Sequence, residues 1–145
     1  MRRALIWATL AFIGFIAATF LLYIRPAFVE LRMRREAESI AEIIASEISF
    51  LSTMREHGAI SGRRVVKVWF PGRKRAEIMI YDSSKEVVVR VIAGDLETIA
   101  SSKYHSEIPV VSPPKVYDGT ILLVLYYDSN LSSFAIAISN LAGGG

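Results

Sequence analysis

The sequence predicts an α+β protein in which a long N-terminal hydrophobic and amphipathic helix precedes an antiparallel β-sheet or β-sandwich domain. Three observations predict it. A charge-free apolar run fills the start of the chain, apolar residues at helical spacing continue to about Arg55, and beyond residue 62 apolar and polar residues alternate. From these changes of period we expect a membrane helix with a short basic leader at 1–26, an amphipathic extension at 27–57, a β domain at 58–142 and a flexible tail at 143–145.

The apolar run covers residues 4–24 and contains neither charge nor proline. About 20 helical residues at about 1.5 Å each cross the roughly 30 Å hydrocarbon core of a bilayer. A secretory signal peptide has a shorter apolar region of about 7–15 residues, whereas this run ends at Tyr23, Arg25 and Pro26. Trp7 lies near its other end, where interfacial aromatic residues are expected. We therefore expect a retained single-pass anchor in membrane lipid, rather than a cleaved signal or a buried core helix.

The extension at 27–57 has one apolar helical face, which carries Ile40, Ile43, Ile44, Ile48, Leu51 and Met54. Arg34 and Glu38 are four residues apart and can pair along the helix. Glycines after His57 and Ser61 are typical of a helix end. Such a stripe requires a partner surface, which we expect the β domain to supply.

Strands are expected at 65–70, 76–81 and 87–93 as an antiparallel meander, at 108–111 as an edge strand limited by Pro109, and at 120–127 and 134–139 as a hairpin. Residues 94–102 are compatible with a short helical turn or a strand. Both faces of 121–125 are apolar. This predicts a central strand, covered on one side by a second sheet or by the helical stripe.

Composition argues against several classes of function. The chain has no cysteine, so disulfides and thiolate metal sites are excluded. Its two histidines, His57 and His105, lie outside any metal-ligand pattern, and its aspartates fall at expected turns. We expect no catalytic activity, no metal and no cofactor. Absence of glutamine and scarcity of asparagine, beside many charged residues, are typical of thermophilic proteins.

Basic residues gather at 2–3, 25–35, 63–64 and 73–75. The first two groups flank the apolar run, where contact with anionic lipid head groups explains them. The third and fourth lie at the two ends of one expected strand, and the alternating pattern indicates that Trp69 and Phe70 pack inward. Nucleic-acid binding would need a wider basic face with stacking aromatics. We therefore expect no nucleic-acid partner, and a solvated turn or an acidic envelope contact at 73–75.

Taken in order, Arg2-Arg3-Ala4 before Leu5, the apolar helix, its amphipathic extension and the β domain resemble the archaeal type IV pilin-like superfamily. That superfamily includes pilins, archaellins and the membrane-anchored β-sandwich proteins of the archaellum base. The resemblance implies a class III signal peptide that a prepilin peptidase cuts after Ala4, with Arg3, Ala4 and Leu5 as processing residues. Pro26 lies where many pilins carry a helix-bending proline.

The resemblance implies a pilin-like structural subunit of an archaeal surface filament of the type IV pilus or archaellum type, assembled with itself or related subunits through the helix. The chain departs from the pattern in two places. Many pilins have a glutamate near the mature start, where this chain has Trp7-Ala8-Thr9, and the leader would have only four residues. These departures leave a second hypothesis, a permanently anchored envelope adaptor or stator whose extracytoplasmic β domain binds a surface-layer or filament-machine protein. A third, a membrane-tethered ligand sensor, would require a concave pocket.

Small residues recur in the apolar helix at Ala4 and Ala8, and at Gly14 and Ala18. This four-residue spacing lets helices approach closely, although alanine and glycine are also common in membrane helices generally. We expect helix packing at Ala8, Gly14 and Ala18.

Two signals bear on orientation, and they disagree. Four arginines at 25–35 outnumber Arg2 and Arg3, and the positive-inside count alone would place the β domain in the cytoplasm. The family resemblance places it outside, which is the orientation we expect. Asn130-Leu131-Ser132 is a glycosylation sequon in an expected turn, usable only outside the cytoplasm. The expected location is the cell membrane, or an extracellular filament after assembly.

Overall fold

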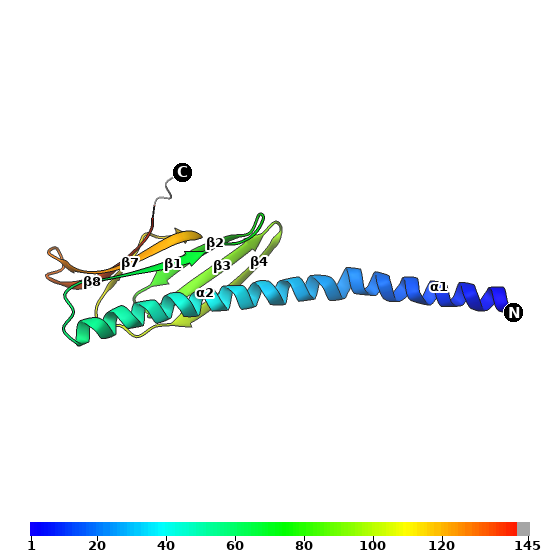
Figure 1. Ribbon diagram of the computed structural model, residues 1–145, viewed down its shortest axis with the longest axis horizontal. Coiled ribbons are helices and arrows are strands. Elements are labelled where there is room, and N and C mark those ends of the chain that lie inside the picture. The colour runs from blue at the N-terminus through cyan, green and yellow to red at the C-terminus, as the bar shows by residue number, and fades with distance from the viewer. Residues whose placement is uncertain (142–145) are drawn as a thin grey trace. The chain divides into compact units, whose positions relative to one another are not determined.

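The computed structural model describes residues 1–141, so the tail expected at 143–145 lies outside the described residues. The described chain begins with α1 (Arg2–Thr19), the π-helical turn η1 (Phe20–Ile24) and α2 (Arg25–Glu56). The strands are β1 (Gly62–Val68), β2 (Arg75–Tyr81), β3 (Glu86–Ala93), β4 (Leu96–Lys103), β5 (Val110–Val111), β6 (Val116–Tyr117), β7 (Gly119–Asp128) and β8 (Ser133–Asn140). This order confirms the predicted α+β class (Figure 1). The chain divides into two compact units, Met1–Met33 and the residues from Arg34 onward.

In the first unit the helix accommodates Pro26 by widening one turn. Proline has no N–H, and its ring would clash with the carbonyl four residues back, which is that of Leu22. The N–H of Arg25 donates to the carbonyl of Phe20, five residues back. This π-turn lets the helix continue through the proline instead of ending there.

The second unit is organised around α2. The helical residues buried there are Ala37, Ile40, Ala41, Ile44, Ala45, Ile48, Leu51 and Ser52. Ile43, which its spacing assigned to the apolar stripe, is 47% exposed, so that assignment was wrong. The buried face is displaced toward the column of alanines, whose small side chains permit close packing. The predicted pair of Arg34 with Glu38 is present at 3.4 Å.

The strands form two four-stranded sheets, ordered β1-β7-β8-β5 and β4-β3-β2-β6. Strand pairs are antiparallel except β5 with β8. The predicted hairpin of β7 and β8 is confirmed, and β7 lies inside its sheet as its apolar faces predicted. The edge strand predicted at 108–111 is reduced to β5, which is indeed at an edge.

The predicted meander was wrong in its first member. β1 pairs with β7, from Gly62 opposite Leu125 to Val68 opposite Gly119, and so belongs to the other sheet. The connection from Trp69 to β2 contains Pro71 and Gly72, and it is longer than the tight turns that join paired neighbours. The meander is instead β2-β3-β4, because residues 94–102 form a strand and not a helical turn.

One of the places where the chain passes from one sheet to the other is between β6 and β7. Asp118 donates its N–H to the carbonyl of Ala76 and accepts that residue's N–H on Oδ1, each at 3.1 Å. Gly119 then adopts φ +121°, a conformation that residues with a Cβ rarely adopt. Asn140 of β8 holds both backbone groups of Tyr117, at 2.8 and 2.6 Å. These hydrogen bonds satisfy backbone groups that lose their neighbour-strand partners where the chain crosses between the sheets.

Gly62 brings α2 against the pair of β1 and β7. A Cβ on Gly62 would lie 3.1 Å from Cδ2 of the fully buried Leu51. Gly62 is opposite Leu125, another buried residue. The helical stripe therefore covers β7 at this point, which is one of the two coverings that the sequence allowed.

Candidate functional site

The apolar surface of the first unit is the main candidate site. None of the residues of α1 or η1 is buried, and Trp7 and Leu22 are 71% and 69% exposed. Helix Arg2–Glu56 contains one stretch that is long and apolar enough to cross a membrane. Thr9 and Thr19 donate their hydroxyls to backbone carbonyls one turn back, at 2.9 and 2.8 Å. Their polar groups are thus satisfied inside the helix, as an apolar surrounding requires.

The three expected processing residues lie together at the exposed start of this helix. Arg3, Ala4 and Leu5 belong to the first turns of α1, where the N–H of Leu5 donates to the carbonyl of Met1 at 3.2 Å. The first four N–H groups of a helix have no partner within it. A peptidase would therefore need to open only the first turn to reach the bond after Ala4.

The expected packing residues share one side of α1. At about 100° per residue, Ala8, Gly14 and Ala18 fall within a sector of about 120°. All three are exposed, and a Cβ placed on Gly14 meets no atom within 4 Å. This side is smooth and open to another helix.

Asn130 lies in the turn that joins β7 to β8, as the sequon's position predicted. Its N–H donates to Oδ1 of Asp128 at 2.9 Å, and Ser132 adopts φ +52° two residues later. Residues 129–132 are exposed. The turn therefore presents the amide of Asn130 at the surface.

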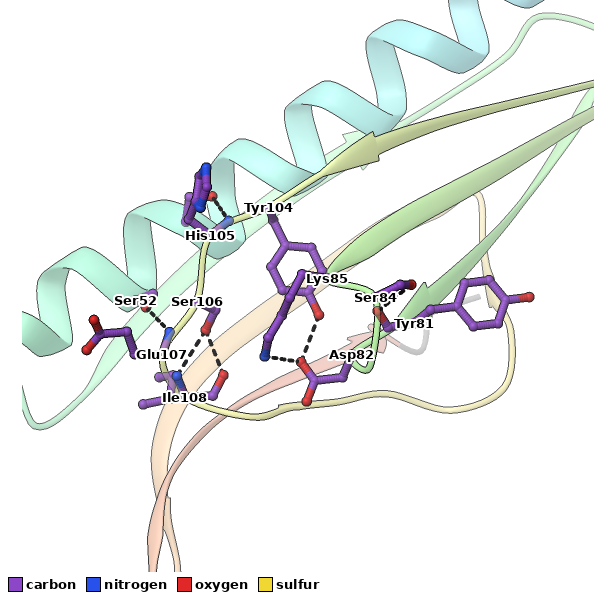
Figure 2. A network of polar contacts seen from close by, with 11 residues as sticks. Ser52, Tyr81, Asp82, Ser84, Lys85, Tyr104, His105, Ser106, Glu107 and Ile108 are labelled. Carbon is purple, nitrogen blue, oxygen red and sulfur yellow. Dashed lines mark hydrogen bonds and ion pairs between the residues drawn. The ribbon is translucent and has the colours of Figure 1, made fainter.

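A polar network that the sequence did not reveal joins the β2–β3 turn to the segment after β4 (Figure 2). Oδ1 of Asp82 accepts hydrogen bonds from Lys85 Nζ at 2.8 Å and from the Tyr104 hydroxyl at 2.9 Å. Burial alone would raise the pKa of Asp82, but these bonds and the N–H of Val110 together lower it. Burial and the bond to Asp82 raise the pKa of Tyr104 far above its ordinary value. The network thus holds a charged carboxylate against a neutral phenol.

Two serines of α2, Ser49 and Ser52, extend this network along the same segment, and Figure 2 shows Ser52 beside Glu107. The backbone N–H of His105 donates to Ser49 Oγ at 3.1 Å, and that of Glu107 donates to Ser52 Oγ at 3.3 Å. Ser49 and Ser52 are three residues apart, so they lie on the same side of the helix. This spacing is the one feature of the sequence that could have indicated a shared contact. These bonds fasten a loop to the helix.

The network has the chemistry of a structural tie. Tyr104 is a poor nucleophile when neutral, and the charged carboxylate of Asp82 is already paired with Lys85. The other histidine, His57, bonds the Thr53 carbonyl at 2.8 Å at the end of α2. Within residues 1–141 no group of three or more acidic, histidine or cysteine side chains is placed to hold a metal ion.

A second surface feature consists of the connection between β1 and β2 and the first residue of β2, residues 69–75, which we name the basic aromatic loop. The expected inward packing of Trp69 was wrong, because β1 ends at Val68 and the indole is 80% exposed. Arg73 and Arg75 are exposed, whereas Nζ of Lys74 lies 3.1 Å from Oε2 of Glu36 on α2. The loop borders an open groove of about 860 Å³ whose other wall includes Tyr117 and Asp118.

Comparisons with protein-family models, with curated proteins and with solved structures give no match for this chain.

Proposed function

We propose that this protein is a pilin-like structural subunit of an archaeal cell-surface filament of the type IV pilus or archaellum type. One observation carries the proposal: a wholly exposed apolar helix leads directly into a helix whose later part is the core of a β domain. The apolar part would lie in lipid before assembly and among sister helices afterward. Both surroundings are apolar, and small residues at Ala8, Gly14 and Ala18 would permit close helix contact.

The mature N-terminus tests the proposal. Intact-mass measurement of the native protein should show loss of Met1 to Ala4, leaving Leu5 first. An Ala4→Leu variant should stay uncut because it enlarges the small residue at the bond, whereas Ala11→Leu, the same change farther along the helix, should be processed normally. Retention of Met1 in the native protein would contradict the filament proposal.

A permanently anchored envelope adaptor or stator is the second candidate. It is favoured by the absence of glutamate shortly after Leu5, where the chain has Trp7-Ala8-Thr9. In this role the helix would stay in lipid, and the β domain would bind a surface-layer or filament-machine protein. Uncut protein in purified membranes, together with its absence from sheared filaments, would support the adaptor.

Both candidates place the β domain outside the cytoplasm. Protease added to intact cells should therefore digest residues beyond α2, and digestion only after lysis would reverse the orientation. Glycosylation would give a second readout, since a mass increase abolished by Asn130→Gln requires an extracytoplasmic turn.

A further inference from the structure

We propose that the basic aromatic loop docks on the anionic surface of the bilayer that holds the apolar helix, with Trp69 entering the head-group layer and Arg73 and Arg75 binding lipid phosphates. This inference rests on the membrane anchoring proposed above. It adds a second, peripheral contact between the β domain and the membrane.

The loop carries the residue types that a membrane interface selects. Trp69 is 80% exposed, although a large exposed indole is unfavourable in water unless it has a partner. Tryptophan is enriched at head-group level, where its apolar body and polar N–H are both satisfied. Among residues 1–141, Arg73 and Arg75 take part in no ion pair, so both charges remain available to an external anion.

The loop also lies at the end of the second unit where the chain enters from the apolar helix. Lys74 contacts Glu36, close to where the chain enters this unit from the apolar helix. The register of Arg75 opposite Ile92 places the turn after β3 at the same end. Figure 1 shows both connections at the end of the sheets away from the last turn of α2.

Chain connectivity limits how far this end can lie from the anchor. Exposed apolar residues continue past Pro26, with Phe28 and Leu31 at 64% and 47% exposure. The expected span ends at Ile24, and Glu36 lies twelve positions farther on, which is about 18 Å of rise in a helix. The head-group layer on each side is roughly 5–7 Å thick. Docking therefore requires the tilt of the helix and the length of the arginine side chains to close the remaining distance of about 11–13 Å between Glu36 and the head-group layer.

Lipid is favoured over a protein partner by this combination of charge and position. A protein contact would usually bury a patch of about 800 Å² per partner. Here one indole and two arginines stand on a narrow loop beside an open groove. Such a small basic and aromatic feature suits the head-group layer of a bilayer, where the arginines can bind phosphates and the indole can enter a thin apolar layer.

Tryptophan fluorescence can test the proposal in the full-length protein. The chain has two tryptophans, so Trp7→Phe leaves Trp69 as the sole reporter. Reconstituted in vesicles of phosphatidylglycerol and phosphatidylcholine, Trp69 should emit at shorter wavelength and be quenched by lipids brominated near the head group. The double variant Arg73→Gln, Arg75→Gln should shift the equilibrium between docked and undocked loop roughly 30-fold toward the undocked state, at about fivefold for each charge removed. High salt should act in the same direction.

Matched variants distinguish failure of the loop proposal from failure of the membrane anchoring. Arg63→Gln with Lys103→Gln removes two exposed charges from the opposite end of the β domain and should leave Trp69 quenched. Trp69→Phe leaves Trp7 to report on the anchor. Quenching of Trp7 without quenching of Trp69 would overturn the loop proposal alone, while loss of both would overturn the anchoring. Protection of Trp69 only in assembled filaments, and not in vesicles, would assign the loop to a subunit contact and overturn the lipid proposal.

Discussion

At the scale of single residues, Asp82 connects parts of the β domain that are distant in sequence. It lies in the turn after β2, and its carboxylate binds Tyr104 after β4. The backbone of Val110, in β5 of the other sheet, also stabilises its charge. A carboxylate can accept several hydrogen bonds at once, which suits it to a junction of this kind. Asp82 therefore contributes to holding the two sheets together.

Tyr104→Phe should destabilise the second unit by about 1–2 kcal/mol, because it removes a hydrogen bond to a charged group that is partly screened by solvent. The measurement is chemical denaturation in detergent, followed by circular dichroism. Tyr81→Phe is the control, since the one hydrogen bond of that hydroxyl within residues 1–141 is to Met79 Sδ, at 3.8 Å, and the residue is 48% exposed. Equal effects of the two variants would contradict a specific role for the bond to Asp82.

The stabilisation that Asp82 contributes should depend on pH. Its pKa is lowered in the folded protein, so the contribution is fully present above the unfolded value of about 3.9 and is lost as the pH falls through the folded pKa. Asp82→Asn should therefore be less stable than the native protein at pH 7, and the difference should shrink as the solution becomes more acidic. A difference that grew on acidification would refute this sign.

At the scale of elements, α2 shows how one helix serves as the centre of a β domain. Alanines at 37, 41 and 45 let it approach the strands, and the larger residues Ile44, Ile48 and Leu51 fill the core. The flanks of this buried face carry polar contacts, such as that of Glu47 with Arg64 of β1. The Arg64 guanidinium also lies 4.7 Å from the centre of the Phe50 ring. Those exposed pairs contribute little to stability compared with burial.

Gly62→Val should cost about 1–3 kcal/mol, because its side chain would overlap Leu51 in a packed core. Thermal unfolding of the variant measures this cost. A second change, Leu51→Val, shortens the opposing side chain and should recover part of the loss when combined with Gly62→Val. Simple addition of the two single losses would show that the residues do not meet.

Gly14→Leu should reduce or abolish filaments while leaving the protein in the membrane, because leucine would fill the space that a second helix needs. Thr9→Leu adds bulk about 140° around the same helix and should be tolerated. Electron microscopy of cell-surface filaments, with membrane fractionation as the second readout, measures both. Normal filaments in the Gly14→Leu variant would argue against close packing at this position.

At the scale of the whole molecule, the chain combines two units with different solvent requirements. The first, Met1–Met33, exposes nearly all of its apolar side chains. The second has its own core, drawn from α2 and from both sheets. A domain that buries its apolar residues has no need of detergent, whereas an exposed apolar helix does.

Removal of residues 1–32 should therefore give a folded protein that stays dispersed in aqueous buffer. The full chain should require detergent or lipid, or should assemble. Size-exclusion chromatography and circular dichroism measure both properties. A full-length chain that remained monomeric in plain buffer would contradict the assignment of the apolar helix to an apolar surrounding.

The helix and the hairpin could be predicted because each depends on residues close together in sequence. An uncharged run of membrane length and a change from helical to alternating spacing are local properties. The processing residues expected at Arg3, Ala4 and Leu5 and the sequon at Asn130 are likewise patterns of neighbouring residues. What the sequence by itself determined is therefore the α+β class, the apolar helix and the pairing of β7 with β8.

Only the tertiary structure decided that β1 joins β7, that Trp69 is exposed and that Asp82 meets Tyr104. Each of these depends on contacts between distant segments, for which many alternative partners have suitable local patterns. Val66 and Val68 alternate equally well for either sheet, and the partner is selected by how the strands share burial across the whole core. The physical reason is that packing is cooperative over the domain, whereas residue periodicity reports only which face of a segment avoids water.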